Sequence, residues 1–246
     1  SWNWKANGAG SANTDGSISS TVSANTTSGF SIVTVADIGS GDFTFGHGLG
    51  VAPSWVLAKS RDGSKWNNYF KSLGAGYTIQ LPETSAKITN AVMWQNTDPT
   101  SSVVYANGNQ LDSNESYVFY CFAEKTGYSK FGRFTSNGNA DNTFVYCGFK
   151  PAWIMMKCDD TTDGWSKWYI FDTTRSPENM NVKELEANST AVESGNGADY
   201  AQIDMLSNGF KLRNGSAWGP ASSGKTNIFM AFAEEPLIGD NPATAR

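Results

Sequence analysis

Hydrophobic residues along this chain gather in short runs, which glycine and small polar residues separate. Clear examples are SWVLAK, residues 54–59, and YVFYCFAE, residues 117–124, while helical periodicity is weak throughout. Short apolar runs between turn residues are typical of β-strands. The runs at residues 117–123 and 228–233 are too short for the usual helix and too apolar for an exposed edge. We therefore predict that they form central strands buried on both faces.

One sequence motif, called the repeated phrase below, occurs twice, about a hundred residues apart. Residues 50–66 read GVAPSWVLAKSRDGSKW, and residues 148–168 read GFKPAWIMMKCDDTTDGWSKW. The matching pairs are Pro53 and Pro151, Trp55 and Trp153, Lys59 and Lys157, and Trp66 and Trp168. In both copies an Asp-Gly pair separates two apolar runs, which predicts a β-hairpin. The offset grows from about 98 to about 110 residues along the chain, which indicates a tandem duplication with insertions in its loops.

We therefore predict an all-β chain of two tandem β-sandwich repeats, jelly-roll-like, each about 100 residues long. The first repeat covers residues 28–126, and the second, with the loop insertions, covers residues 127–246. Residues 1–27 are rich in Gly, Ser and Asn and contain no core-forming run, so they predict a flexible N-terminal arm. The best helical window, residues 177–189, predicts one or two helical turns over one end of a sheet.

Two tryptophans in this arm, Trp2 and Trp4, are at strand spacing, so one face of the segment carries both indoles. An arm with two large apolar rings on one face suits docking on a neighbouring surface. We predict that Trp2 and Trp4 are oligomer contacts.

Charge and composition argue against several classes of function. The chain has 246 residues, a net charge of −5 and no basic run, so nucleic acid is not an expected partner. No apolar run approaches the roughly 18 residues of a membrane-spanning helix, so membrane insertion is not expected. Cys121, Cys147 and Cys158 sit in or beside apolar runs and are expected to be buried and free. One disulfide with a spare thiol is the alternative.

Catalytic chemistry finds little support in the sequence. The single histidine, His47, lies between glycines in FGHGLG and is expected to be a turn residue, not a member of a Ser-His-Asp arrangement. The carboxylates with aromatic neighbours are Glu115, Glu124, Asp172, Glu234 and Glu235. Glu124 and Glu234 are equivalent in the two copies, so we expect them to serve the fold. Residues 158–165, CDDTTDGW, resemble a calcium loop but lack the Glu that an EF-hand requires. We predict no catalytic residue, cofactor or metal.

The tryptophans are the strongest indication of a binding function. Trp94, Trp165 and Trp218 lie in polar loops and have no counterpart in the other copy. Exposed tryptophan rings can stack on sugar rings while neighbouring Asn and Asp side chains bond to hydroxyls. We take these three residues as candidate glycan contacts, with capping of a sandwich end as the alternative. The tryptophans that both copies share are assigned to the core or to a domain seam.

Several separate phrases together resemble a known family. They are residues 4–34 (WKANGAGSANTDGSISSTVSANTTSGFSIVT), 46–53 (GHGLGVAP), 120–132 (YCFAEKTGYSKFG), 206–214 (LSNGFKLRN) and 242–246 (PATAR). They resemble the C-terminal duplicated module of marine bacteriophage tail-fibre and virion structural proteins. The resemblance implies an extracellular virion protein that forms a homo-oligomer, with a trimer as one candidate. It also implies contact with other virion proteins, and it carries no catalytic residue to this chain.

The leading hypothesis is a non-enzymatic virion protein, a tail fibre or spike component that contacts a glycan or receptor on the host surface. One alternative is a capsid decoration or self-assembling filament protein without a receptor. The other is a carbohydrate-active enzyme or a sugar-binding module. Under the leading hypothesis, function lies in loops that the copies do not share, at residues 98–115, 177–202 and 216–225.

Overall fold

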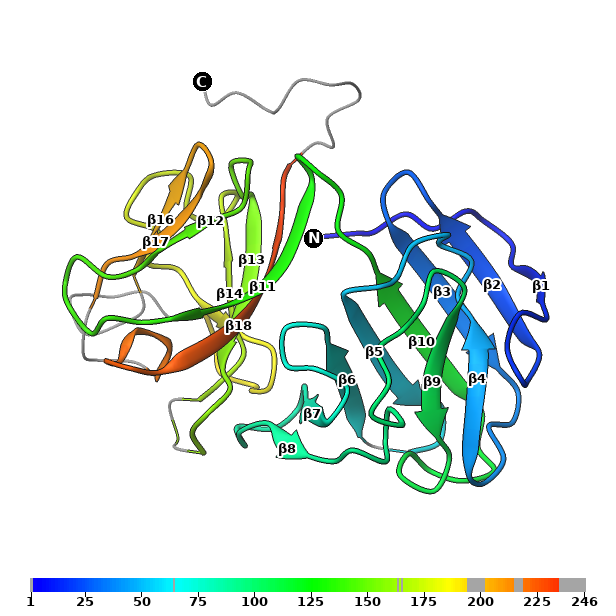
Figure 1. The fold of residues 1–246 in the computed structure, drawn as a ribbon. Helices are drawn as coiled ribbons and strands as arrows, with labels where there is room; N and C mark the ends of the chain where they lie inside the picture. Colours follow the sequence, from blue (N-terminus) through cyan, green and yellow to red (C-terminus); the bar gives the residue numbers. More distant parts are fainter. Residues whose placement is uncertain are drawn as a thin grey trace. The chain divides into compact units, whose positions relative to one another are not determined.

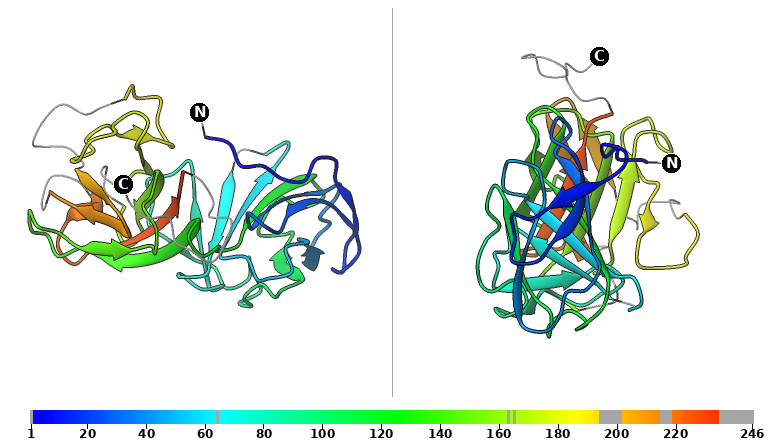
Figure 2. Two further views of the ribbon diagram at one scale, coloured as in Figure 1. Left: turned by 90° about the horizontal axis from the view of Figure 1, so that it is seen from above. Right: turned by 90° about the vertical axis from the view of Figure 1, so that its right-hand side faces the viewer.

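The computed structural model describes residues 2–63, 65–162, 164, 166–193, 202–214 and 219–234. These residues form β-strands joined by turns and loops (Figures 1 and 2). The described residues also include one short 3-10 helix at Gly219–Ala221. The prediction of an all-β fold is confirmed. The chain divides into two compact units, which are described separately below. Unit 1 comprises residues 1–81 and 87–125, and unit 2 comprises residues 82–86 and 126–246.

Unit 1 contains one large and one small antiparallel sheet. The large sheet has the order β1-β2-β3-β10-β5-β6-β7-β8, and the small one pairs β4 with β9. The strands of the large sheet are β1 (Ser11–Asn13), β2 (Ser20–Asn25), β3 (Phe30–Val35), β10 (Tyr117–Phe122), β5 (Trp55–Ser60), β6 (Trp66–Phe70), β7 (Tyr77–Gln80) and β8 (Ile88–Thr89). Those of the small sheet are β4 (Asp42–Gly46) and β9 (Val103–Asn107).

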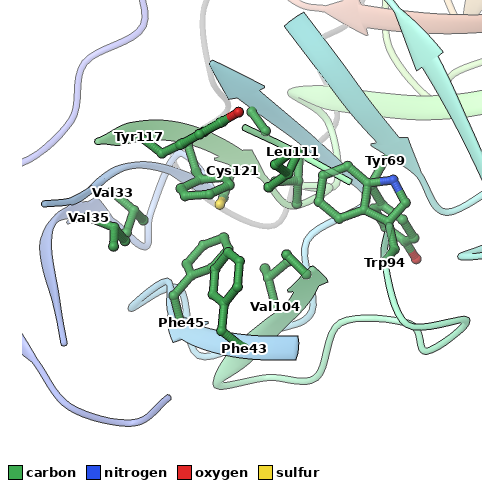
Figure 3. Close-up of a cluster of buried hydrophobic side chains, with 14 of the residues drawn as sticks. Val33, Val35, Phe43, Phe45, Tyr69, Trp94, Val104, Leu111, Tyr117 and Cys121 are labelled. Carbon is green, nitrogen blue, oxygen red and sulfur yellow. The ribbon is translucent and has the colours of Figure 1, made fainter. Parts of the chain in front are cut away.

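The core of unit 1 lies between these two sheets. Phe43, Phe45 and Val104 from the small sheet point toward Tyr117 and Cys121 on β10 (Figure 3). The ring of Phe45 stacks on that of Phe119, with their centroids 4.1 Å apart. Alternation along each strand places one set of side chains in this core and the other set on the opposite face. This layered arrangement is consistent with a β-sandwich.

Unit 2 also contains two antiparallel sheets. Their orders are β11-β18-β13-β14-β15 and β12-β17-β16. The first sheet consists of β11 (Ser129–Thr135), β18 (Thr226–Phe232), β13 (Trp153–Cys158), β14 (Tyr169–Asp172) and β15 (Leu185–Glu186). The second consists of β12 (Phe144–Tyr146), β17 (Gly209–Leu212) and β16 (Ile203–Leu206). The core between them includes Val145, Phe210 and Phe229, and the last two rings meet edge to face at 5.3 Å.

Four strands in each unit follow corresponding orders, β3-β10-β5-β6 and β11-β18-β13-β14. The runs predicted as central strands are β10 and β18, and each has hydrogen-bonded strands on both sides. Burial on both faces is complete at β18 from Asn227 onward, whereas Val118 and Tyr120 on β10 are half-buried. The prediction of central position is therefore confirmed, and that of full burial holds for β18 alone.

The repeated phrase builds the same local structure in each unit. Trp55 stacks on Phe122, with ring centroids 4.5 Å apart, and Trp153 contacts Phe232 at 5.7 Å. The two predicted hairpins are present as the antiparallel pairs β5–β6 and β13–β14.

The lysine of the repeated phrase stabilises each hairpin by contacts with backbone carbonyls and an indole ring. Lys59 Nζ donates to the backbone oxygens of Ser60 and Gly63 and lies 5.8 Å from the ring centre of Trp66. Lys157 Nζ donates to Ser166 O and lies 5.9 Å from the ring centre of Trp168. Both ammonium groups combine a carbonyl contact with a cation–π contact. The Lys and Trp residues that the two copies share therefore have the same structural role in each unit.

Two predictions about the path of the chain are wrong. Within the expected flexible arm, Ser11–Asn13 and Ser20–Asn25 form β1 and β2, which extend the large sheet beyond β3. Val22 reaches the core, and Ser20 Oγ donates to Gly46 O over 3.1 Å, so long-range contacts order a segment whose composition favours disorder. The window at 177–189 contains no helix; Asn181 bridges to Ile203 instead, and Leu185–Glu186 pairs with β14.

The unit boundary and the cysteines can be compared with their predictions. The division between the units falls after Lys125, whereas the sequence placed the repeat boundary after residue 126. Cys121, Cys147 and Cys158 are all buried and free, as predicted. Within the described ranges, no helix has the length and apolar character needed to cross a membrane.

Candidate functional site

The structure removes Trp94 from the candidate glycan contacts. Its side chain is only 1% exposed and belongs to the core of unit 1, where it meets Tyr69 edge to face at 6.0 Å (Figure 3). Stacking on a sugar requires an exposed ring face, which Trp94 does not offer. The prediction failed because Trp94 packs into the core of unit 1 although the residues around it are polar. Trp165 and Trp218, the other two candidates, lie outside the described residues.

The two candidate oligomer contacts are both half-buried. Trp4 meets Phe122 of the same unit edge to face, with centroids 6.0 Å apart. Part of its indole therefore already has an intramolecular role. A contact between subunits through Trp2 and Trp4 stays a prediction.

His47 is a buried structural residue. Its Nε2 lies 3.1 Å from Thr100 O, and its Nδ1 accepts from the Leu49 amide over 3.2 Å. This pair of contacts favours the neutral tautomer with the proton on Nε2. Burial lowers the pKa of His47 below its ordinary value, so the ring remains neutral.

Four of the carboxylates that the sequence singled out form structural contacts. Glu115 accepts from Ser60 Oγ, and Asp172 accepts from the Arg175 side chain at 2.5 Å. In the segment from Cys158 onward, which lacks the Glu of an EF-hand, Asp159 forms two 2.7 Å hydrogen bonds with Arg133, and Asp160 accepts from the Thr226 amide at 3.0 Å. Among the described residues, no group of three or more His, Cys, Asp or Glu side chains is placed to hold a metal ion.

A different pair of aromatic residues is exposed, on β12 in unit 2. Phe144 is 42% exposed and Tyr146 is 65% exposed, whereas Val145 between them points into the core. In the described part of the chain, these two are the only aromatics among the exposed large hydrophobic side chains. Because they are two residues apart on one strand, their Cα atoms are about 7 Å apart on the same face.

The register of the small sheet places polar groups beside these rings. Phe144 pairs with Lys211, which in turn pairs with Asp204. Tyr146 pairs with Gly209, which pairs with Leu206 on the far strand. The outer face of β12-β17-β16 is thus aromatic along β12 and charged near the Phe144 row.

Two glycines lie next to the rings of this face. A Cβ atom at Gly209 would lie 2.0 Å from Val145 O and 3.1 Å from Phe144 Cε2, so the missing side chain lets the Phe144 ring lie close to the sheet. At Gly148 a Cβ atom would sit 3.6 Å from the Tyr146 hydroxyl, so this ring extends over Gly148. Flat, accessible rings offer apolar faces to a ligand.

A network of four charged residues borders the Phe144 end of this face. Asp141 Oδ1 lies 2.6 Å from Lys211 Nζ and 2.8 Å from an Arg213 terminal nitrogen. Arg213 Nε lies 3.2 Å from Asp204 Oδ2. Together they provide hydrogen-bond donors and acceptors next to an aromatic surface.

The corresponding region of unit 1 is covered. At the offset that relates Pro53 to Pro151, Phe144 and Tyr146 correspond to Gly46 and Gly48. Added Cβ atoms there would lie 1.7 Å from Asn13 Oδ1 and 2.9 Å from Val22 Cγ1, respectively. The segment that carries β1 and β2 therefore lies over this part of unit 1.

Unit 2 cannot cover its face in the same way. Only residues 123–128 separate β10 from β11, which is too short for a pair of strands like β1 and β2. Large aromatic residues also stand where unit 1 has the two glycines that Asn13 and Val22 contact. We call the outer surface formed by Phe144, Tyr146 and the four charged residues Asp141, Asp204, Lys211 and Arg213 the β12 face.

The β12 face can pack against flat, partly apolar ligands and bond to their hydroxyls. Sequence reasoning missed it, because the search for binding residues concentrated on tryptophan. A usable signal existed: TFVYC alternates aromatic and aliphatic residues at a position where the first copy reads GHG. The alternation predicts one exposed set of side chains, but it does not say which set.

Comparison with known proteins assigns a family and no activity. Residues 1–236 match the family described as a domain of unknown function, DUF7483. The match covers well over half of the chain. No curated protein and no solved structure matches the chain.

Proposed function

We propose that this chain, which belongs to the DUF7483 family, is a bacteriophage virion protein of the tail-fibre or spike type that binds a host-surface glycan through the β12 face. The resemblance of its sequence phrases to marine phage virion proteins supports the virion location. The exposed pair Phe144 and Tyr146 is the observation that carries the binding role. In this role the protein is a non-enzymatic component of the extracellular particle.

Exposing the rings of Phe144 and Tyr146 to water costs free energy. Large aromatic side chains are normally withdrawn from water, and an exposed apolar patch usually marks an interaction site. The apolar C–H face of a sugar ring packs on an aromatic ring, and its hydroxyls need donors and acceptors nearby. Tyr146 and Lys211 supply these two kinds of contact within one small sheet.

The wider architecture suits a particle-surface protein. We propose that the two units are tandem copies of one β-sandwich, jelly-roll-like in origin, and the corresponding orders β3-β10-β5-β6 and β11-β18-β13-β14 support this. A rigid strand framework fixes the position of a binding surface. In a homo-oligomer, several weak glycan contacts would add through avidity, which is the reason to expect self-association and contact with other virion proteins. The proposed N-terminal arm is limited to residues 2–10, which precede β1 and lie outside the sheets.

The two alternatives make different demands on the β12 face. A capsid decoration or filament protein would use exposed aromatics to bind another virion subunit, and added sugars would not compete. A carbohydrate-active enzyme requires paired carboxylates across a cleft. The described carboxylates on the β12 face, Asp141 and Asp204, are engaged with Arg213 and Lys211, which favours binding over hydrolysis.

Attachment of the purified, labelled chain to host cells tests this proposal. Tyr146→Ala and Phe144→Ala should each reduce attachment about tenfold, because each removes one ring face from the ligand. Val92→Ala in unit 1 is the matched control, since it truncates an exposed apolar side chain of similar exposure. Near-wild-type melting temperatures would confirm that the variants fold.

The proposal fails if both ring variants attach as well as the wild type. Full inhibition of wild-type attachment by cell-surface polysaccharide would identify the receptor as a glycan. Loss of particle assembly in these variants, with attachment unchanged, would support the capsid decoration alternative instead.

A further inference from the structure

The charges on the β12 face cancel. Lys211 and Arg213 are the two cations in its network, and Asp141 and Asp204 are the two carboxylates. Asp141 is the most exposed of the four, at 75% of its side chain, and it contacts both cations. The hydrogen bond from Lys211 holds the pKa of Asp141 below its ordinary value, so this carboxylate is ionised at neutral pH.

We propose that the β12 face selects neutral glycans over acidic ones, because each of its cations is already matched by a carboxylate. This inference rests on the proposed function and specifies the chemical class of its ligand. The ligand is a neutral oligosaccharide with at least two sugar rings. One ring stacks on Tyr146, and the next reaches the charged network beside Phe144.

Hydroxyl groups fit this network better than a sugar carboxylate does. A hydroxyl can accept from Lys211 or Arg213 and donate to Asp141 or Asp204, and such charge-assisted bonds are stronger than neutral ones. No ion pair has to break for these bonds to form.

A uronic acid or sulfated sugar would meet a different situation. To reach either cation it must displace Asp141 or approach it within a few ångströms, where the two negative charges repel. Exposed ion pairs contribute little to stability, so an anionic sugar can displace Asp141 from Lys211 or Arg213. The displaced Asp141 carboxylate nevertheless stays near the bound anion. The net attraction for an anion is therefore small, and salt should change binding little.

Direct titration of the full chain with defined sugars tests the inference. The neutral probes are maltohexaose, mannohexaose and cellohexaose, and the acidic probe is an alginate hexasaccharide. For the wild type we expect binding to at least one neutral probe, with a Kd that changes less than twofold between 50 and 300 mM NaCl. Alginate binding should be at least tenfold weaker.

A gain of function provides the sharper test. Asp141→Asn removes one carboxylate and leaves a surplus positive charge, so affinity for alginate at 50 mM NaCl should rise about fivefold and fall again at 300 mM. Glu178→Gln is the control, because it makes the same change in net charge at an exposed position of unit 2 that has no part in this network. It should leave alginate binding unchanged.

The failures of the two proposals can be told apart. Tight, salt-sensitive alginate binding by the wild type that Lys211→Ala and Tyr146→Ala both abolish would overturn neutral selectivity and keep the glycan-binding function. An Asp141→Asn variant with unchanged alginate affinity would also overturn the selectivity. If the wild type binds neither class and Tyr146→Ala attaches to cells normally, the proposed function itself fails, and the inference with it.

Discussion

Single residues in this protein gain their roles from burial more than from chemical type. The one histidine, His47, is fully buried between a carbonyl acceptor and an amide donor. Cys121 lies in the same core, and burial raises its pKa to about 12. Groups that could be reactive in water are thereby kept neutral and out of reach. Lys157, by contrast, is a buried basic side chain, and its Nζ contacts the Ser166 carbonyl oxygen and the indole ring of Trp168.

The lowered pKa of His47 predicts how stability depends on pH. The unfolded chain binds a proton at His47 below about pH 6.5, whereas the folded chain does not until a lower pH. Its contribution is therefore fully present above pH 6.5 and decreases as the pH falls toward the folded pKa. We expect a slope of up to about 1.4 kcal/mol per pH unit between pH 5.5 and 6.5, measured by urea denaturation.

The control for this slope is His47→Gln. The amide nitrogen of Gln can donate to Thr100 O, and its oxygen can accept from the Leu49 amide, but it does not titrate. Since the chain has no other histidine, the slope in this window should disappear. An unchanged slope in His47→Gln would show that another group titrates there.

At the scale of the element, a strand is held in place by side chains that enter the core and by small residues that let its backbone approach the neighbouring strand. β17 illustrates both, because Phe210 and Leu212 enter the core while Gly209 lies against β12. Hairpins of the repeated phrase were predictable, since their turn residues and apolar runs are adjacent in sequence. The pairing of β2 with β3, and that of Asn181 with Ile203, could not be predicted from the sequence. These weakly apolar segments become ordered by hydrogen bonding to strands that are distant in sequence.

Gly209→Ala tests the close approach of β12 and β17. The added methyl group would overlap Val145 O, which is backbone and cannot rotate away, so the strands must separate. We expect a loss of about 1–3 kcal/mol in the free energy of unfolding, together with weaker glycan binding as Phe144 shifts.

Gly164→Ala is the matched control for this substitution. Of the residues that the structure describes, none has an atom within 4 Å of a Cβ at Gly164, so the stability of this variant should stay within about 0.5 kcal/mol of the wild type. Equal stability of the two variants, measured by chemical denaturation, would contradict the tight packing of β12 on β17.

The whole molecule consists of two units that share an order of strands and differ in what covers them. Unit 1 has β1 and β2 as additional strands, and Gly46 and Gly48 lie beneath their segment. Unit 2 has a three-stranded small sheet with exposed rings on β12. Unit 1 is thus covered by its own N-terminal segment, whereas in the described part of unit 2 the rings on β12 are exposed, and there we propose that binding occurs.

We predict that this protein self-associates. We expect multi-angle light scattering to give a mass of more than one chain for the wild type, with a trimer as one candidate, in line with the proposed homo-oligomer. Trp2→Ala should shift this mass toward the monomer, because it removes one of the two proposed contacts while leaving Trp4 on Phe122.

Asn3→Ala, a change at an exposed neighbouring position, should leave the mass unchanged. A wild-type monomer would argue against avidity as the means of host attachment. Deleting residues 1–27 is a poor test of assembly, because it would also remove β1 and β2 from the large sheet.

The sequence alone determined the all-β class, the central positions of β10 and β18, and the hairpins of the repeated phrase. These features depend on local periodicity and on turn residues that act over a few positions. Tertiary structure decided which aromatics are exposed: Trp94 is in the core, and Tyr146 is at the surface. Alternation divides a strand into two faces, but whether a face meets water depends on segments distant in sequence. In unit 1 the segment bearing β1 and β2 lies over such a face, and in unit 2 the connection before β11 is too short to supply one.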